Sequence, residues 1–476
     1  MNRNNFVIHL ALAIVLILVA AFAGQLAKWR KQWKSHVSIV PAEQKKRGAS
    51  TTEEIALSEA RGFGRPEVLV KFKSDVSRET IDALMSRMND RVEDRIENAP
   101  GWEAIDDLDN ADAAATVAQY SSMPEVEYAE ENYEISLSQT IEVRTAVTTY
   151  QPLRFPKDPL FGEQWALANS GQRGGKEGAD INATNAWAIT TGSEEVVIAV
   201  LDSGVDYRHE DLAPNMWKRP ASVAPYGDAE LGSVDDEEGF NAIDNAADPM
   251  DDNGHGTHCA GIIGAEGGNN IGITGVNWHV RIMPLKFMNA GGFGTTKDAI
   301  EAINYVIDRK KAGVNVRIIS ASWGSTQKSR ALGDAIRAAY ENDILFVAAA
   351  GNATTNNDRS PHYPSSYDVP NVISVAALDR NDQLASFSNY GFKSVAIAAP
   401  GKDILSTWLG NSYEEKSGTS MATPVVSGVA ALIVAANPRI SVDQLRKRLL
   451  ASVDPLPALK GKIVTGGRVN AAKALQ

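Results

Sequence analysis

The feature that most constrains the fold is a series of strand-length apolar segments after residue 158, which alternate with amphipathic helical patterns. The segments are nearly continuously apolar, which is typical of strands buried on both faces of a parallel sheet. Helical periodicity between them, as in 296–311 and 329–340, supplies layers that cover the sheet. The sequence therefore predicts an α/β fold with a doubly wound, mostly parallel sheet. Its predicted strands are 196–201, 280–287, 316–322, 344–349, 372–377 and 394–399.

A smaller unit is predicted upstream, in residues 65–137. Strand patterns at 67–72, 102–105 and 126–130 alternate with helical patterns near 81–85 and at 111–120, which gives a βαβαβ order and a small α+β, ferredoxin-like fold. Residues 138–157 show no periodicity and contain Pro152 and Pro156. We expect this stretch to be an exposed connector, which is where proteolytic processing occurs.

The N-terminus carries a nearly unbroken apolar run at residues 6–24, behind a short polar stretch with Arg3. A helix of this length is long enough to span a bilayer, and Ala21-Phe22-Ala23 fits a small-residue cleavage site. Residues 1–24 are therefore predicted to be a cleaved signal peptide or, less favoured, a membrane anchor, followed by a polar linker at 25–64. Either alternative predicts a secreted or otherwise extracytoplasmic protein, in contact with a membrane only if the run is uncleaved.

Charge and cysteine content exclude several classes of function. Lys and Arg number 47 against 59 Asp and Glu, so the formal net charge is −12. No broad basic surface is then expected to neutralise a phosphate backbone, and nucleic acid is not a predicted partner. Cys259 is the sole cysteine, which excludes an intrachain disulfide and a zinc site built from several thiolates.

Polar side chains stand where predicted strands end and predicted helices begin. Asp202 directly follows the strand 196–201, and Asn352 follows 344–349. His255 lies between two glycines at a predicted helix start, and Ser420 opens a helix that ends before Asn437-Pro438. Because sites in parallel sheets form beyond the carboxyl ends of the strands, we expect these side chains to meet.

These residue types supply the parts of nucleophilic catalysis. A serine hydroxyl attacks an amide only when a base takes its proton, and an imidazole is that base when a carboxylate holds its tautomer. Ser420 at the positive end of a helix would also lie where a developing oxyanion is stabilised. The chain order Asp202, His255, Ser420 is one of the known orders of such a triad.

Three segments resemble the signature blocks of the subtilisin-like serine proteases, namely 200–205, 255–261 and 418–424. The resemblance covers about residues 158–476 and implies that Asp202 orients His255. It further implies that His255 acts first as base and then as acid, that Ser420 is the nucleophile, and that Asn352 and the Ser420 N–H stabilise the oxyanion. A serine endopeptidase that forms an acyl-enzyme with protein or peptide substrates is the expected activity.

The resemblance extends to substrate binding and to the upstream unit. The segments Ser322-Trp323-Gly324 and Gly292-Phe293-Gly294 resemble the two strands that pair with the substrate backbone. Residues 65–137 are similar to the family's inhibitor and folding-chaperone propeptide. We therefore expect a self-processing zymogen, inhibited by its own propeptide and monomeric, with a peptidase domain at 158–476.

Calcium is the cofactor that the resemblance implies, in a structural role. The expected site combines the side chains of Asp158, Asp211 and Asn269 with carbonyls of the loop at Gly267, Ile271 and Ile273. In the thermitase-like branch of the family a second loop would run through Asn241, Asp244, Ala246, Asp248 and Met250. Asn241 and Ala246 stand where that branch has aspartates, which leaves the occupancy of this loop open.

Two other functions remain as alternatives. A silent member of the family would use its cleft only to bind peptides, although all four catalytic positions are filled. A metal-dependent hydrolase would use His255, His258 and nearby aspartates, although no Glu follows the first histidine as in the zinc metalloprotease helix. We expect His258 to be a hydrogen-bonded core residue and Cys259 a buried small hydrophobe.

Overall fold

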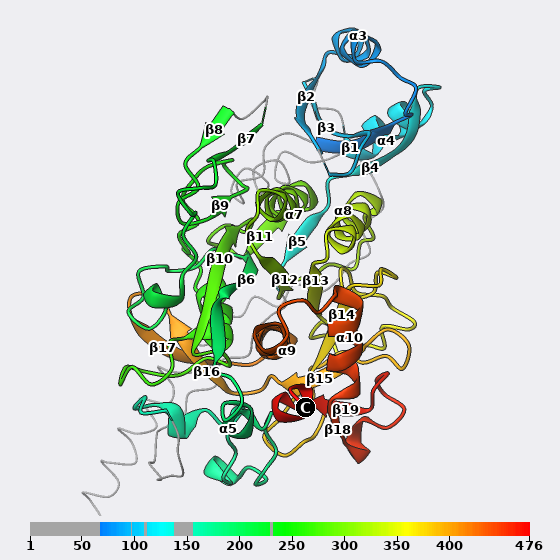
Figure 1. Ribbon diagram of the computed structural model, residues 1–476. Coiled ribbons are helices and arrows are strands. Elements are labelled where there is room, and N and C mark those ends of the chain that lie inside the picture. The colour runs from blue at the N-terminus through cyan, green and yellow to red at the C-terminus, as the bar shows by residue number, and fades with distance from the viewer. Residues whose placement is uncertain (1–66, 97, 109–111, 138–155, 229–231) are drawn as a thin grey trace, which may run out of the picture. The chain divides into compact units, whose positions relative to one another are not determined.

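The computed structural model describes residues 67–96, 98–108, 112–137, 156–228 and 232–476 (Figure 1). These residues all belong to one compact unit that spans Thr52–Gln476. The predicted leader at 1–24, the polar linker at 25–64 and residues 138–155 of the connector lie outside the described residues.

A nine-stranded sheet forms the centre of the larger domain, with the strand order β18-β19-β15-β14-β13-β12-β6-β10-β9 (Figure 1). Its neighbours pair in parallel except at β18–β19, which confirms the predicted α/β fold. The predicted strand at 394–399 starts late, at Ile397, because the Asp358 carboxylate holds the Ser394 N–H and hydroxyl. The strands are β6 (Gly192–Asp202), β9 (Phe240–Asn241), β10 (His279–Lys286), β12 (Val316–Ala321), β13 (Leu345–Ala349), β14 (Val372–Leu378), β15 (Ile397–Pro400), β18 (Val453–Pro455) and β19 (Gly467–Val469).

Helices cover both faces of this sheet, as the alternation along β6 shows. Val196, Ile198 and Val200 pack in one core with α6 (His255–Gly264) and α9 (Thr419–Ala436). The intervening residues of β6 pack in the other core with α7 (Thr296–Lys311) and α8 (Arg330–Glu341). Shorter helices are α5 (Ala183–Ala186), α10 (Val442–Ala451) and α11 (Ala471–Ala474), with 3₁₀ turns at Phe161–Glu163, Gln172–Gly174, Ala213–Asn215 and Pro457–Leu459.

Local chemistry fixes where the main helices begin. α7 starts with a capping box in which the Thr295 hydroxyl and the Asp298 carboxylate each accept a backbone N–H, and its last turn is basic. α9 is apolar on every side, and among the described residues it is the one helix long and apolar enough to cross a membrane. Because 89% of that stretch is buried inside the domain, α9 is a core helix.

The smaller domain is a four-stranded antiparallel sheet with the order β2-β3-β1-β4. It contains β1 (Glu67–Phe72), α3 (Arg78–Met88), β2 (Asp90–Arg95), β3 (Trp102–Asp107), α4 (Ala113–Ser121) and β4 (Val126–Glu131). This βαββαβ order is that of a ferredoxin-like fold. The predicted βαβαβ order was wrong by one strand, since β2 is an edge strand whose six residues include five charged ones and show no apolar pattern.

Three further strand pairs lie outside these sheets. β7 (Tyr226–Asp228) pairs with β8 (Gly232–Val234), and β16 (Ile404–Trp408) pairs with β17 (Ser412–Lys416). The third pair joins the two domains, because β5 (Glu134–Ser136) follows the small domain in the chain and pairs with β11 (Phe293–Thr295) of the large one (Figure 1).

Candidate active site

The fold brings the four predicted catalytic residues to one edge of the central sheet. Asp202 ends β6, and Asn352 follows β13. His255 is the first residue of α6, and Ser420 is the second residue of α9. The side chains of Asp202, His255 and Ser420 are all buried.

Asp202 and His255 form the tightest contact of the site. Asp202 Oδ1 lies 2.7 Å from His255 Nδ1. Burial lowers the pKa of His255, but the charge of Asp202 and its hydrogen bond outweigh burial, so the pKa is raised well above its ordinary value. Within the described part of the chain, His255 Nε2 has no hydrogen-bond partner. The imidazole is therefore held through Nδ1, and Nε2 is the ring nitrogen left to exchange a proton with a substrate or nucleophile.

Ser420 lies beside this pair but is hydrogen-bonded elsewhere. Its hydroxyl donates to Ser322 O over 2.9 Å, and the Ser322 hydroxyl donates to Ser420 O over 2.8 Å. Cys259 Sγ lies 3.9 Å from His255 Nδ1 and 3.6 Å from Ser420 O. Burial raises the pKa of Cys259, so its thiol is a neutral packing group behind the imidazole.

Two hydrogen-bond donors converge above Gly418. Asn352 Oδ1 accepts from both the N–H and the hydroxyl of Thr419, each at 2.8 Å, which turns Nδ2 to the opposite side. Asn352 Nδ2 has no partner among the described residues. A Cβ built on Gly418 would lie 3.1 Å from Asn352 Nδ2 and 3.5 Å from Ser420 N, so both donors face one small volume. This arrangement suits a developing oxyanion at a helix N-terminus.

Sequence reasoning missed two residues that hold this geometry. Thr419 fixes the Asn352 amide as described above. Asp251 is buried and accepts from Gly254 N, the Thr257 N–H and hydroxyl, and the Ser203 hydroxyl. The signal was available, because an acidic residue just before a predicted helix start is typical of N-terminal capping.

Both predicted substrate-binding segments flank β5, which comes from the chain itself. Residues 134–136 pair antiparallel with Phe293, Gly294 and Thr295, and Leu137 N donates to Gly292 O over 3.1 Å. On the other side Ser136 forms an antiparallel bridge with Gly324. The side chain of Trp323 does not take part, because it is buried and donates from Nε1 to Leu201 O.

The predicted calcium residues form a cluster of buried oxygen groups. Asp158 accepts from Gly268 N and Asn269 N, and Asp211 accepts from Asn269 Nδ2 and Ile273 N. Burial, together with the charge of Asp211, raises the pKa of Asp158 to about 6, and burial also raises that of Asp211. Two buried carboxylates that meet at one loop are the kind of oxygen ligand that a hard divalent cation takes.

The second predicted calcium loop is closed by its own hydrogen bonds. Asn241 Nδ2 donates to Asp244 Oδ2 over 3.0 Å, and Asp248 Oδ1 accepts from Met250 N and the Tyr207 hydroxyl. An amide nitrogen thus lies where a carboxylate ligand would be needed. These side chains fit a cation less well than the cluster at Asp158 and Asp211.

His258 is a core residue, which speaks against the zinc alternative. Its Nε2 lies 3.1 Å from Ile404 O and 3.0 Å from Glu414 O. Burial lowers its pKa to about 3. The ring is therefore neutral, and its Nε2 is engaged by backbone carbonyls rather than turned toward His255 and a shared metal.

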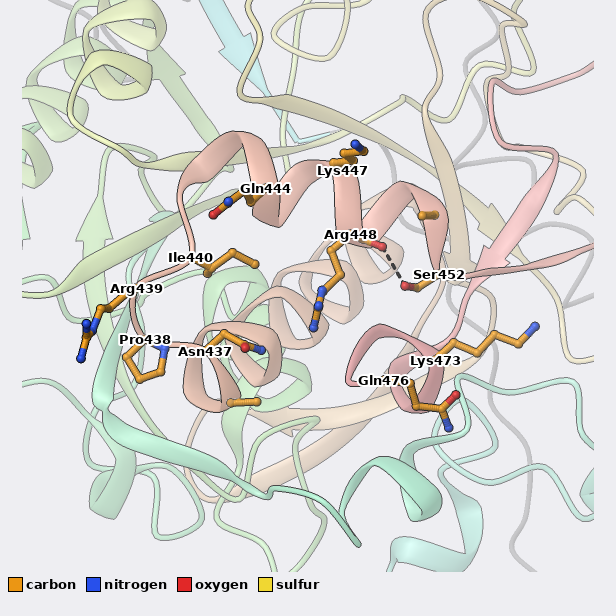
Figure 2. Close-up of a pocket in the computed structure, with 12 residues that line it drawn as sticks. Asn437, Pro438, Arg439, Ile440, Gln444, Lys447, Arg448, Ser452, Lys473 and Gln476 are labelled. Carbon is orange, nitrogen blue, oxygen red and sulfur yellow. Dashed lines mark hydrogen bonds between the residues drawn. The ribbon is translucent and has the colours of Figure 1, made fainter.

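A pocket of about 800 Å³ lies at the opposite end of α9 from Ser420 (Figure 2). Basic side chains line it, including Arg439, Lys447, Arg448 and Lys473. Its lining includes Ser452 but no histidine and no acidic side chain, so it cannot supply the three groups that meet at the sheet edge. We therefore assign the candidate active site to the residues around Ser420.

Taken together, the doubly wound sheet and this arrangement of Asp, His and Ser define a serine protease of the subtilisin-like class. Comparison with known proteins agrees. The model of the subtilase family matches residues 193–468, which is more than half of the chain, and the chain belongs to the subtilase family. The model of the fervidolysin N-terminal prodomain matches residues 49–132.

Individual relatives are serine proteases as well. The chain is 33% identical over 434 residues to a thermophilic serine proteinase of Bacillus sp. (strain AK1), covering 89% of this chain and 91% of that one. It is 36% identical over 321 residues to thermitase of Thermoactinomyces vulgaris, covering 67% of this chain and 99% of thermitase. A solved protease structure from Pseudoalteromonas arctica PAMC 21717 matches with a TM-score of 0.55 and 28% identity, over 67% of this chain and 98% of that one. The protein is thus a serine endopeptidase with an N-terminal prodomain.

Proposed function

We propose that the peptidase domain hydrolyses peptide bonds through an acyl-enzyme on Ser420, and that the chain is made as a self-processing zymogen. The observation that carries this proposal is the 2.7 Å contact of Asp202 with His255 Nδ1, which leaves Nε2 without a partner among the described residues. The free Nδ2 of Asn352 and the N–H of Ser420 supply the second requirement, a pair of donors for the oxyanion.

The reaction proceeds in two transfers. The Ser420 hydroxyl leaves Ser322 O, gives its proton to His255 Nε2, and its oxygen forms a bond to the carbonyl carbon of the peptide. Asn352 Nδ2 and Ser420 N stabilise the negative oxygen, and His255 then gives the proton to the departing amine. Water, deprotonated by His255, attacks the acyl-enzyme and returns the hydroxyl to Ser420. Asp202 keeps its charge throughout and stabilises the imidazolium.

The register of β5 indicates which bond is cut in maturation. Ser136 lies opposite Gly324 in an antiparallel bridge, so in a strand that kept this register a residue two positions further on would lie opposite Ser322. Ser322 is hydrogen-bonded to Ser420 through both its hydroxyl and its carbonyl. A strand that continues β5 in register would present the peptide bond after residue 138 to Ser420. We therefore propose that processing separates Ser138 from Gln139.

Labelling with a serine-directed fluorophosphonate tests the catalytic assignment. The purified wild-type enzyme should gain one label on the peptide that contains Ser420 and lose its activity on casein. The Ser420→Ala variant should gain none, whereas Ser427→Ala, which removes another buried serine of α9, should be labelled like wild type. A folded protein that neither takes the label nor cleaves casein would support the silent alternative instead.

A structural calcium ion is a second proposal for the peptidase domain. Asp158, Asp211 and Asn269 would hold it with carbonyls of Gly267, Ile271 and Ile273. When bound, it would neutralise the two buried carboxylates and tie the loop 267–273 to them. Millimolar calcium should then raise the Tm of wild type by several degrees and that of Asp211→Ala by much less. An equal rise in both proteins would rule out this site.

The remaining proposals concern where the protein is located, its oligomeric state and its domain boundaries. We propose an exported monomer with a prodomain at 65–137 and a peptidase domain at 158–476. The apolar run at 6–24 supports export, and a relative 35% identical over 328 residues is named a halolysin-like extracellular serine protease of Natrialba magadii. The prodomain match begins at residue 49, inside the segment predicted as a polar linker.

A further inference from the structure

The register of β5 also defines where the substrate residue before the cleaved bond must lie. That residue, called P1, takes the position opposite Ser322, two residues beyond the one that bridges Gly324. Directly opposed residues of an antiparallel pair point to the same face, and residues two apart along a strand share a face. The P1 side chain therefore points to the face on which a Gly324 side chain would lie.

His362 occupies that face. A Cβ built on Gly324 would lie 2.1 Å from His362 Cε1 and 2.6 Å from its Nε2, so the imidazole rests against the Gly324 backbone. A Cβ built on Gly351 would lie 3.0 Å from His362 Cδ2. Gly324 belongs to the segment that pairs with the substrate, and Gly351 directly precedes the oxyanion donor Asn352. The ring thus bridges the two backbone walls between which a P1 side chain has to enter.

The imidazole is firmly held in this position. Tyr363, the next residue, exchanges two backbone hydrogen bonds with Ser325, each at 2.8 Å. His362 O accepts from the Ser365 hydroxyl, and His362 N donates to the Ser366 hydroxyl. The side chain is 9% exposed, and burial lowers its pKa to about 4, so at neutral pH the ring is an uncharged wall. The ring itself is held at Nδ1, which lies 3.4 Å from the Ser365 hydroxyl, so displacing the imidazole would break this contact.

We propose that His362 closes the floor of the P1 pocket and restricts the enzyme to substrates with a small P1 side chain, such as alanine or serine. This inference rests on the proposed function of Ser420 and adds its substrate class. A large side chain would have to push the ring out of a packed position, whereas a methyl or hydroxymethyl group fits beside it. The chain's own residue 138, at the proposed processing site, is a serine.

Peptide substrates that differ only at P1 test the inference. For the wild-type mature enzyme, kcat/KM should be at least about 10-fold higher with P1 alanine than with P1 phenylalanine, the size of effect that pocket fit alone produces. His362→Gly should raise the ratio of kcat/KM for P1 phenylalanine to kcat/KM for P1 alanine by at least about 10-fold. His362→Asn, a smaller polar replacement, should fall between the two.

The outcomes separate this inference from the proposed function. Turnover of P1 alanine by each variant shows that it is folded and that the triad works. Equal kcat/KM for both substrates in wild type, or an unchanged ratio in His362→Gly and His362→Asn, would overturn the role of His362 while the serine mechanism stands. Absence of turnover with every substrate, together with no fluorophosphonate labelling of wild type, would contradict the proposed function itself.

Discussion

The two sheets of the molecule are buried in different ways. The nine-stranded sheet has helices of its own domain on both faces, with α6 and α9 on one and α7 and α8 on the other. The prodomain sheet covers only one face by itself: Val68, Val70 and Phe72 of β1 pack with residues of α3 and α4. Residues of its other face, including Leu69 and Trp102, belong to the hydrophobic core that contains α7 and α8 of the peptidase domain.

The prodomain also depends on the peptidase domain for several of its hydrogen bonds. Glu130 at the end of the prodomain is buried and accepts from the Ser329 hydroxyl and from Arg330 N and Ala331 N, the first N–H groups of α8. Asn132 accepts from Lys297 N in the first turn of α7. The peptidase domain thus completes its own core, whereas the prodomain completes part of its core and several hydrogen bonds only when docked. A released prodomain is expected to be marginally stable and easily degraded.

The largest expected effect is a loss of catalysis in Asn352→Ala without a loss of prodomain binding. Asn352→Ala removes one oxyanion donor from the peptidase domain, so kcat should fall by roughly 100-fold to 1000-fold with little change in KM. Because the Asn352 side chain hydrogen-bonds to Thr419 and, within the described part of the chain, not to β5, inhibition by the separated prodomain should stay the same. Steady-state kinetics on the mature enzyme measure the first quantity and titration with the prodomain the second. A normal kcat would remove Asn352 from the site.

A smaller effect is expected at the prodomain side of the interface. Glu130→Ala removes a buried acceptor and leaves the Ser329 hydroxyl and the Arg330 and Ala331 N–H groups at the start of α8 without it, so the inhibition constant of the prodomain should rise about 10-fold to 100-fold. The control is Glu127→Ala, since Glu127 is exposed and contributes only a 3.7 Å ion pair with Lys71. Equal inhibition by the two variants would show that the contact at α8 does not stabilise docking.

The smallest predicted effect is the pH dependence of docking. Burial raises the pKa of Glu67 well above its ordinary value and that of Asp298 to about 6. The charge of Lys297 lowers both pKa values, but by less than burial raises them. Burial likewise raises the pKa of Asp94, while a hydrogen bond from Glu67, together with Lys297, holds that of Glu93 below its ordinary value. The docked state therefore retains protons that the separated domains release.

Since the raised pKa values exceed the ordinary values of 4.5 for Glu67 and 3.8 for Asp298, their contribution to docking is fully present below about pH 3.8 and is lost as the pH rises through 6. The dissociation constant of the prodomain, measured by calorimetry with the inactive Ser420→Ala enzyme, should increase several-fold between pH 5 and pH 8. Glu67→Gln should flatten this profile. Tighter binding of the prodomain at pH 8 than at pH 5 would show that docking does not retain these protons.

The sequence predicted the peptidase domain better than the prodomain for a physical reason. Strands buried on both faces, such as β12 and β13, need continuous apolar runs that no other element resembles at that length. The four catalytic positions followed from strand ends, helix starts and glycines. In contrast, β2 is a charged edge strand with no apolar pattern to indicate it.

The roles of Asp251 and His362 could not be predicted from the sequence pattern either, because both depend on tertiary contacts. Asp251 is recognisable as a cap only once the start of α6 is fixed. His362 lies over a hundred residues from His255 in the chain, and nothing in its local sequence indicates that it rests on Gly324 and Gly351. Such contacts depend on how distant loops meet at the sheet edge, which composition and periodicity do not encode.

The central claim is that the chain cuts itself after β5, with Ser420 as nucleophile and the prodomain strand as first substrate. N-terminal sequencing of the protein made in a host that lacks other extracytoplasmic proteases tests this most directly. Wild type should yield a mature species that begins at Gln139, and Ser420→Ala should remain a precursor that still contains the prodomain. A Ser420→Ala protein cut at the same bond, or a wild-type enzyme whose first cut lies elsewhere, would contradict the account.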